Sequence, residues 1–346
     1  MSARIEIDLA AFRANVRLLS DLVSPARTML AVKANAYGHG LVPLARAALD
    51  SGADSLAVLE VPAALELREA GIEAQIFAWL HGRHTDFAAA VESDIDLGVS
   101  ALWQVDAICA VARTKPGRVH LKVDTGLHRN GANPEDWPAL VSAALDAERQ
   151  GKLEIVGLWS HLADASAEDD AAALALFLES VAVAESLGCR DRLLHLAASS
   201  AGIREPEARL GLVRFGIAAY GISPFDDQSA AQLGLRQVMS LRAPVTSLSD
   251  GVATIGVGSA DGIQVPAIGS AYVAIRRKTH PILELGIDTV TIDVAHSTVE
   301  VGDEVTVFGP GDDREATAEQ WAQWGGTIGD EIVARASERL SRTSVG

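Results

Sequence analysis

A lysine at the end of an apolar run is the residue of this chain whose position most clearly suggests chemistry. Residues 29–32 read Met-Leu-Ala-Val, Lys33 follows directly, and a glycine-flanked turn with Tyr37 and His39 comes next. An amine at the tip of a buried strand is poorly hydrated, so it loses its proton more easily. A neutral lysine amine can form a Schiff base with an aldehyde cofactor. The alternative is a lysine that merely reaches the solvent from a strand end.

The elements that must position this lysine follow an alternating pattern. The short apolar runs expected to be strands are residues 29–33, 56–59, 75–80, 95–99, 119–123, 155–160, 193–196 and 210–214. Alanine-rich segments with helical periodicity separate several of them, such as residues 62–70, 103–111 and 171–187. Alternation of this kind implies a parallel sheet, and eight strands predict a closed (β/α)8 TIM-like barrel. A doubly wound open sheet is the alternative, although no Gly-x-Gly-x-x-Gly follows the first strand.

The pattern changes after Asp226. From Val238 onward no helices are expected, and β-branched residues cluster or alternate in residues 253–257, 271–275, 289–294 and 304–308. Such runs, punctuated by Gly-Asp and Gly-Pro pairs, predict an all-β domain. We therefore expect a barrel at residues 1–230, whose first few residues can join the second domain, and a β domain at residues 231–346. The segment 327–340 is expected to be a final helix or strand.

Composition restricts the class of protein. The chain is 49% hydrophobic and 22% charged, as ordinary globular proteins are. A net charge of −17 argues against a nucleic-acid partner, which requires clustered Lys and Arg. No stretch approaches the ~18 apolar residues of a membrane span, and the N-terminus lacks the apolar core of a signal peptide. Two cysteines form no disulfide framework and no zinc motif. We expect a cytoplasmic protein without a metal or a membrane partner.

Functional-looking side chains follow five of the expected strands. They are Lys33, Lys122 with Arg129, His161, Ser199, and Arg214. In a barrel of this kind, the C-terminal strand ends carry the chemistry. Lys, Arg and Ser side chains together with backbone N–H groups of Gly216 and Ile217 suit a phosphorylated aldehyde. Arg214 is positioned to face a heteroaromatic ring nitrogen.

At these residues the sequence resembles the alanine racemase family, which are pyridoxal-phosphate enzymes of fold type III. The segments that carry the resemblance are residues 31–40 (AVKANAYGHG), 120–129 (HLKVDTGLHR), 160–163 (SHLA), 195–201 (HLAASSA) and 213–221 (VRFGIAAYG). The resemblance covers nearly the whole chain. It implies a Schiff base between pyridoxal 5'-phosphate and Lys33, which would also be one of two acid–base groups. It further implies an obligate homodimer in which the β domain of one subunit covers the barrel mouth of the other.

The resemblance also implies roles for further residues. The phosphate would be held by Tyr37, Ser199, Gly216 and Ile217. Arg214 would bind the pyridine nitrogen, and because arginine stays protonated, that nitrogen would not be. The remaining roles are Arg129 at the phenolic oxygen and the substrate, Lys122 as the lysine that is often carbamylated to orient that arginine, and His161 beside the cofactor. The implied substrate is alanine or a similar small amino acid.

The chain departs from the family pattern in its C-terminal part. The string Gly-Tyr-Ala-Asp-Gly, which holds the second acid–base group of the family, reads GSADG at residues 258–262, so Ser259 replaces the tyrosine. An alkyl hydroxyl is a far poorer proton donor and acceptor than a phenol of pKa about 10. Asp330 stands where the family has a tyrosine that helps to hold the phosphate. Ile287, in the substrate site, stands where a methionine is usual.

These departures leave three functions open. The first is a racemase of alanine with an atypical second base, Ser259. The second is a pyridoxal-phosphate enzyme that needs only the lysine face, such as a decarboxylase or an epimerase. The third is a catalytically degenerate relative that still binds the cofactor.

Overall fold

The computed structural model describes residues 2–346. The chain folds into two compact units. One comprises Arg17–Lys33 and Ala48–Gly216, and the other comprises Met1–Val16, Ala34–Ala47 and Ile217–Gly346. Each contains one eight-stranded sheet. We refer to them as the barrel unit and the β unit.

The barrel unit contains eight parallel strands in the order β8-β7-β6-β5-β4-β3-β2-β9. They are β2 (Arg27–Ala31), β3 (Ser55–Val58), β4 (Gln75–Ala78), β5 (Ile95–Val99), β6 (Gly117–Lys122), β7 (Leu153–Trp159), β8 (Leu193–His195) and β9 (Leu212–Phe215). Two hydrogen bonds join the ends of this order, from Gly211 N to Leu194 O (3.1 Å) and from Arg214 N to Ala197 O (3.1 Å). The predicted closed barrel is confirmed, and the open doubly wound sheet is wrong.

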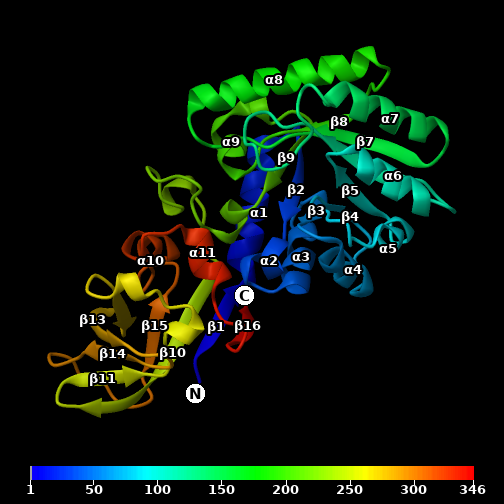
Figure 1. Cartoon of the computed structure of the whole chain (residues 1–346). Helices are drawn as coiled ribbons and strands as arrows, with labels where there is room; N and C mark the ends of the chain where they lie inside the picture. Colours follow the sequence, from blue (N-terminus) through cyan, green and yellow to red (C-terminus); the bar gives the residue numbers. More distant parts are fainter. Residues whose placement is uncertain (1) are drawn as a thin grey trace. The chain divides into compact units, whose positions relative to one another are not determined.

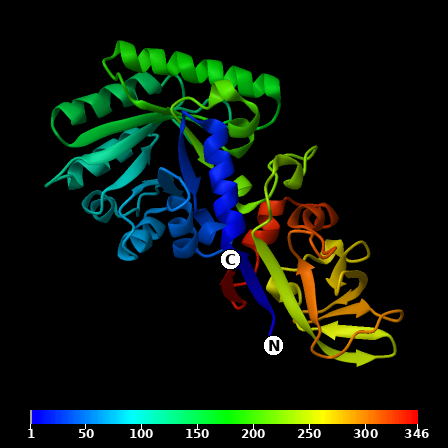
Figure 2. The ribbon, with the colours of Figure 1, turned by 180° about the vertical axis from the view of Figure 1, so that it is seen from behind.

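Helices follow most of these strands. They are α3 (Leu41–Leu49), α4 (Val61–Glu69), α5 (Phe87–Glu92), α6 (Leu102–Val111), α7 (Trp137–Arg149), α8 (Ala167–Ser186) and α9 (Ser199–Arg204). In two opposite views, α8 is the long helix at the outer edge of the barrel (Figure 1, Figure 2). Both faces of a barrel sheet are buried, so its strands form continuous apolar runs. This is why these strands could be located from sequence, as the wholly buried β3 and β5 illustrate.

The β unit contains the strand order β11-β14-β13-β12-β15-β10-β1-β16. These strands are β1 (Arg4–Asp8), β10 (Met239–Ser249), β11 (Val252–Ile255), β12 (Tyr272–Ile275), β13 (Lys278–Leu285), β14 (Val290–Asp293), β15 (Glu304–Phe308) and β16 (Ser341–Val345). All pairs are antiparallel except β1 with β16. The N-terminal strand thus belongs to the same sheet as the C-terminal strands. After it, α1 (Leu9–Val23) begins where the Asp8 carboxylate accepts a hydrogen bond from Ala11 N (2.8 Å).

The expectation that helices are absent beyond Val238 is wrong. The unexpected helix of the β unit is α10 (Ala318–Gly325), whereas α11 (Gly329–Ala334) lies in the segment 327–340 and confirms that a helix occurs there. A capping box begins α10, because Thr317 accepts from Gln320 N while Gln320 accepts from Thr317 N. This Thr-x-x-Gln pattern is the signal in the sequence that indicates the start of the helix. The buried Trp321 then anchors the helix through its indole N–H to Val307 O (2.9 Å).

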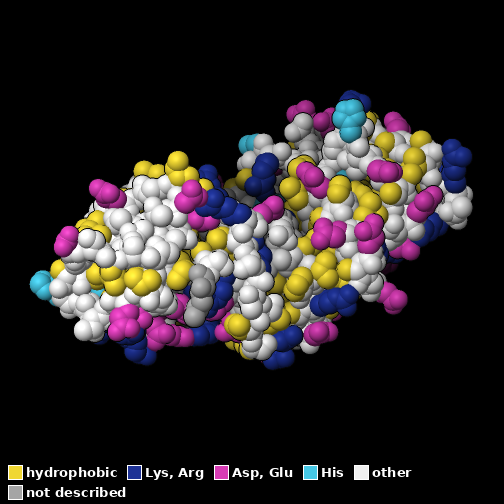
Figure 3. Space-filling model, turned by 90° about the horizontal axis from the view of Figure 1, so that it is seen from below, with side chains coloured by type: hydrophobic (Ala, Val, Ile, Leu, Met, Phe, Trp, Pro, Cys, Tyr) yellow, Lys and Arg dark blue, Asp and Glu magenta, His cyan; other side chains and the backbone are white. Residues whose placement is uncertain are grey.

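Three further features are membrane-spanning helices, the state of the cysteines and the distribution of surface charge. No helix within residues 2–346 is long and apolar enough to cross a membrane. Cys109 and Cys189 are free thiols. Acidic side chains are scattered over the face seen in Figure 3, among basic and apolar ones, which is how this surface distributes the negative charge.

Candidate active site

Four cations surround a histidine at the C-terminal ends of the barrel strands. Burial lowers the pKa of His161 well below its ordinary value, and the charges of Arg214, Lys122, Arg129 and Lys33 lower it further. These residues come from different parts of the barrel: Lys33 follows β2, Lys122 ends β6, His161 follows β7, and Arg214 lies in β9. The structure therefore brings together five of the residues that strand-end reasoning selected.

Lys122 is buried and its amine is unusually easy to deprotonate. Burial, followed by the charges of Arg214 and Arg129, lowers its pKa from 10.5 to about 7. Its Nζ lies 4.4 Å from the centre of the Trp159 ring, which attracts the protonated form. Asp124 is the carboxylate that opposes this shift. Near neutral pH a substantial fraction of Lys122 is therefore a neutral nucleophile.

Arg214 is buried and held from several sides. Its Nη2 donates to the carbonyl oxygens of Ser160 (2.9 Å) and Leu196 (2.8 Å) and lies 3.2 Å from His161 Nδ1. Its Nη1 donates to His195 Nδ1 (2.9 Å). Burial lowers the pKa of Arg214 to about 9, so it is protonated at neutral pH. The Nε–H takes part in none of these bonds.

Two of the residues expected at a phosphate are hydrogen-bonded to each other. Gly216 N donates to Ser199 Oγ (3.0 Å), and both residues are buried. Ser199 is the first residue of α9, and Gly216 directly follows β9. The pairing places a hydroxyl and a glycine backbone next to each other at the same end of the barrel.

The segment that begins at Lys33 has an unusual backbone. Ala34, Asn35 and Ala36 have φ of 51° to 54° and ψ of 47° to 54°, and Tyr37 has φ of 51°. They form one turn of left-handed helix, labelled α2 (Lys33–Tyr37), with a hydrogen bond from Gly38 N to Ala34 O (2.9 Å). Each such residue with a Cβ costs about 1–2 kcal/mol. Backbone strain of this kind is typical of functional sites.

Tyr37 lies in the β unit among aromatic rings. It is 6% exposed, and its ring centre is 4.8 Å from that of Tyr220. Burial raises its pKa, and the charge of Asp330 raises it further. Tyr37 is therefore a neutral phenol, and Asp330 lies within electrostatic range of it. Ile217, also expected at the phosphate, is buried in the same unit.

Ser259 and Ile287 lie on two adjoining loops of the β unit. Ser259 N donates to Gly286 O (3.0 Å), and Ala260 N donates to Ile287 O (3.0 Å). The side chain of Ile287 is 71% exposed. The same two loops are held together by Arg339, which donates to the carboxylates of Asp261 (2.7 and 2.9 Å) and Asp288 (2.7 Å).

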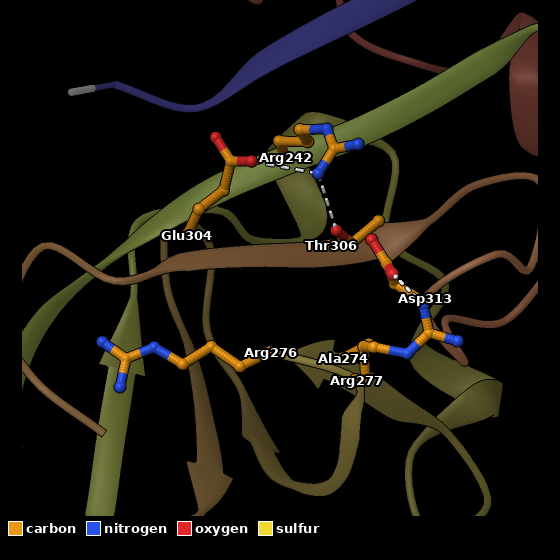
Figure 4. A pocket seen from close by; sticks show the side chains of 7 residues that line it. All are labelled: Arg242, Ala274, Arg276, Arg277, Glu304, Thr306 and Asp313. Atoms are coloured by element: carbon orange, nitrogen blue, oxygen red, sulfur yellow. Dashed lines mark hydrogen bonds and ion pairs between the residues drawn. The ribbon is translucent and has the colours of Figure 1, made fainter. Parts of the chain in front are cut away.

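A separate pocket of about 300 Å³ lies in the β unit and contains none of the predicted site residues. It is lined by Arg242, Ala274, Arg276, Arg277, Glu304, Thr306 and Asp313 (Figure 4). Each arginine is paired with a carboxylate, as Arg242 with Glu304 and Arg277 with Asp313 show. Its charges therefore largely compensate one another, so it is a network of ion pairs rather than a site for an anion.

The residues of the barrel rim fit an anionic cofactor. Lys33, Arg129 and Arg214 bring positive charge near His161, as does Lys122 when it is protonated, and Asp124 is the carboxylate that acts on Lys122. Such an excess of partly buried positive charge is unfavourable unless an anion neutralises it. A phosphate and a phenolate, as in pyridoxal phosphate, would do so. Among residues 2–346, no three His, Cys, Asp or Glu side chains are grouped to hold a metal.

Sequence reasoning missed three features of this site. Trp159 supports both Lys122 and Arg214, whose Cζ lies 5.1 Å from its ring centre. A tryptophan at the end of an apolar run is ordinarily interpreted as a core residue, so the sequence around Trp159 does not indicate a role at the site. The left-handed turn was also missed, since alanine does not favour that conformation. The third is a chain of buried histidines behind Arg214.

Comparison with known proteins identifies the family. The model of "Alanine racemase, N-terminal domain" matches residues 7–224, and that of "Alanine racemase, C-terminal domain" matches residues 241–344. The alanine racemase of Streptomyces coelicolor is 41% identical and is aligned over 100% of this chain and 96% of its own length. The alanine racemase of Beutenbergia cavernae is 38% identical, with 99% and 98% covered.

Solved structures of alanine racemases are also similar to this chain. The crystal structure of alanine racemase from Streptomyces lavendulae superposes with a TM-score of 0.96 at 38% identity, covering 100% of this chain and 97% of that one. The enzymes of this family use pyridoxal 5'-phosphate as cofactor. By both its halves and its full length, this chain belongs to the alanine racemase family.

Proposed function

We propose that this protein is a pyridoxal-phosphate-dependent racemase that interconverts L- and D-alanine. The observation that carries the proposal is the cluster of Lys33, Lys122, Arg129, His161 and Arg214 at the barrel rim. Its relatives of about 40% identity over the full length are named alanine racemase. Nothing in the fold or in the comparisons favours the decarboxylase, the epimerase or the degenerate relative.

The cofactor supplies an aldehyde that captures amines and a ring that takes up electron density when the α-hydrogen leaves. Lys33 holds the cofactor and moves a proton on one face of the substrate. Arg214 donates to the ring nitrogen. Because its pKa is about 9, it keeps its own proton at neutral pH, and the ring nitrogen stays unprotonated. By leaving the ring nitrogen unprotonated, Arg214 would make the bound cofactor a weaker electron sink and so would limit side reactions.

The remaining barrel residues bind and orient. Ser199 and Gly216, together with Tyr37 and Ile217, hold the phosphate. Tyr37 is a neutral phenol and can donate to the phosphate, but the nearby charge of Asp330 repels the same group.

Arg129, which is exposed, contacts the phenolic oxygen and the substrate. Lys122 orients Arg129. His161, whose pKa is lowered by burial and by the cations around it, contacts the cofactor as a neutral ring. Ile287 contributes its backbone to the substrate site.

The second face of the substrate belongs to Ser259. We place it at the site of a partner subunit, so that the protein is a homodimer with shared active sites. A serine hydroxyl is a weak acid and a weak base, so it acts through a water and the reaction on this face is slow.

We propose the boundary between a barrel domain, residues 1–230, and a β domain, residues 231–346, with β1 joining the latter's sheet. A cytoplasmic location is part of the same proposal.

The test compares wild type with Ser259→Tyr, measuring cofactor content and the rate of D-alanine formation from L-alanine. We expect slow racemisation by wild type and a gain of about 10²-fold with the phenol, the usual contribution of a positioned acid or base. Ser270→Tyr, an exposed serine elsewhere in the β unit, is the control and should leave the rate unchanged. Cofactor binding without racemisation in either protein would refute the proposal.

A further inference from the structure

Two fully buried histidines connect Arg214 to a carboxylate inside the barrel. His195 Nδ1 lies 2.9 Å from Arg214 Nη1, and His195 Nε2 lies 2.9 Å from His120 Nδ1. His120 Nε2 in turn lies 3.3 Å from Asp96 Oδ2. The residues come from β9, β8, β6 and β5. The residues of this hydrogen-bond chain beyond Arg214, which are His195, His120 and Asp96, have no role in the proposed function.

The chemistry of the donors sets the direction of every bond in this chain. Arg214 can only donate, so His195 Nδ1 accepts and carries no proton. The proton of neutral His195 is therefore on Nε2 and is donated to His120 Nδ1. By the same reasoning His120 carries its proton on Nε2 and donates it to Asp96. Burial and the charge of Arg214 lower the pKa of His195 well below its ordinary value, which agrees with a neutral ring.

Asp96 ends the chain as a buried anion. Its side chain is 1% exposed. Burial by itself would raise its pKa, but hydrogen bonds from His120, Arg118 and Gln75 lower it below the ordinary value. Arg118 Nε donates to Asp96 Oδ1 (2.7 Å), and Arg118 also pairs with the half-exposed Glu154. The carboxylate thus accepts from three donors, which an amide in its place could not do.

The surroundings of the histidines are apolar and closely packed. The Trp159 ring stacks on His195 at 5.6 Å with an angle of 4°, and the Phe77 ring lies 4.7 Å from His120. A Cβ on Gly157 would lie 2.5 Å from His120 Nδ1, so only glycine leaves room for this ring. Buried polar groups in such a core are costly unless each is hydrogen-bonded. This core contains two buried imidazoles, and each of their ring nitrogens has a hydrogen-bond partner in the chain from Arg214 to Asp96.

The charges explain why Arg214 needs such support. Lys122, Arg129 and Lys33 add positive charge at the same rim. The hydrogen-bond acceptors described for Arg214 are two carbonyls and two histidine nitrogens, and none is a carboxylate. Asp96 is the anion at the end of its hydrogen-bond chain, and aligned dipoles of two imidazoles lie between them.

We infer that Asp96, His120 and His195 are positioning residues for Arg214: they fix the plane of its guanidinium and supply the counter-charge that keeps it a donor toward the cofactor ring. The inference rests on the proposed function for the statement that Arg214 faces the ring nitrogen. The assignment of the hydrogen-bond chain does not rest on it. A change at Asp96, which lies three hydrogen bonds from Arg214, should therefore alter the cofactor bound by Arg214.

The test uses Asp96→Asn in the holoenzyme, with Asp94→Asn as the matched control. Asp94 is two residues away, exposed, and paired with Lys115 at the surface. Long-range ¹H–¹⁵N spectra of histidine-labelled protein should show His120 and His195 as neutral Nε2–H tautomers, assigned with His120→Gln and His195→Gln. Asp96→Asn should abolish the single tautomer of His120 and shift the visible absorption band of the bound cofactor. It should also lower kcat about tenfold with KM within twofold.

A second pair of variants keeps the test decisive if Asp96→Asn folds poorly. Glutamine accepts with one atom and donates with the other, so His120→Gln can preserve the chain, whereas His120→Leu breaks it. We expect the cofactor band of His120→Gln to match wild type and that of His120→Leu to shift. Equal bands in these two folded variants, or a protonated or Nδ1–H His195, would overturn the inference. Loss of racemisation alone would refute only the proposed function, because the tautomers and the cofactor band are read without turnover.

Discussion

Replacing Ala34 by glycine should stabilise the protein, although glycine normally weakens helices. Ala34 is exposed and has φ of 51° within the left-handed turn after Lys33. Removing its Cβ relieves about 1–2 kcal/mol of steric cost. About 0.4–1 kcal/mol of this stabilisation is lost, because glycine gives the unfolded chain greater conformational freedom. The expected net effect is a rise of about 0.5–1 kcal/mol in the free energy of unfolding.

The control is the same substitution in a right-handed helix. Ala171 is an exposed residue of α8, where alanine to glycine costs about 1 kcal/mol. The two variants should therefore shift in opposite directions in urea unfolding, measured at one protein concentration with saturating cofactor, since ligand and association both shift apparent stability. Equal destabilisation by Ala34→Gly and Ala171→Gly would refute the assignment of strain to this turn.

Further predictions concern the same turn and Lys122. Gly38→Ala should destabilise the protein by about 2–3 kcal/mol in urea unfolding, because a Cβ there would meet Val333 O at 2.5 Å and φ is +80°; an unchanged midpoint would contradict this. The folded state lowers the pKa of Lys122 from 10.5 to about 7, so the unfolded chain binds more protons between these values. Stability should rise with pH across that window, and Lys122→Met should remove this rise when CO₂ is excluded; parallel pH profiles would show that the amine is not perturbed. With ¹³C-bicarbonate, the neutral amine should attack CO₂, form a C–N bond and release a proton, giving a carbamate ¹³C resonance that Lys122→Met lacks.

The positions of the barrel strands could be predicted because both faces of each strand are buried. Residues 95–99 were assigned correctly as a strand, and the other barrel strands lie within a few residues of the apolar runs. The β unit was harder. β13 (Lys278–Leu285) was not predicted, since its exposed and buried residues alternate irregularly. The helix α10 was not predicted, because the sequence before it is rich in strand-forming residues.

The candidate site could be predicted where it depends on strand ends alone. In a parallel barrel all C-terminal strand ends lie on one rim, so Lys33, Lys122, His161 and Arg214 had to converge if the fold was right. Their environment could not be predicted in this way. The pKa of Lys122 is lowered first by burial and then by the charge of Arg214, which is distant in sequence, and both act only once the barrel closes.

The sequence by itself determined the family, the alternation that builds the barrel, and which strand ends carry chemical groups. These depend on local periodicity and on residue types at short spacing. The tertiary structure alone decided the left-handed turn after Lys33 and the hydrogen-bond chain from Arg214 to Asp96. Alanine has no preference for a left-handed turn, so surrounding contacts must impose it. The protonated nitrogen of each histidine is set by partners on other strands, and no local pattern in the sequence encodes them.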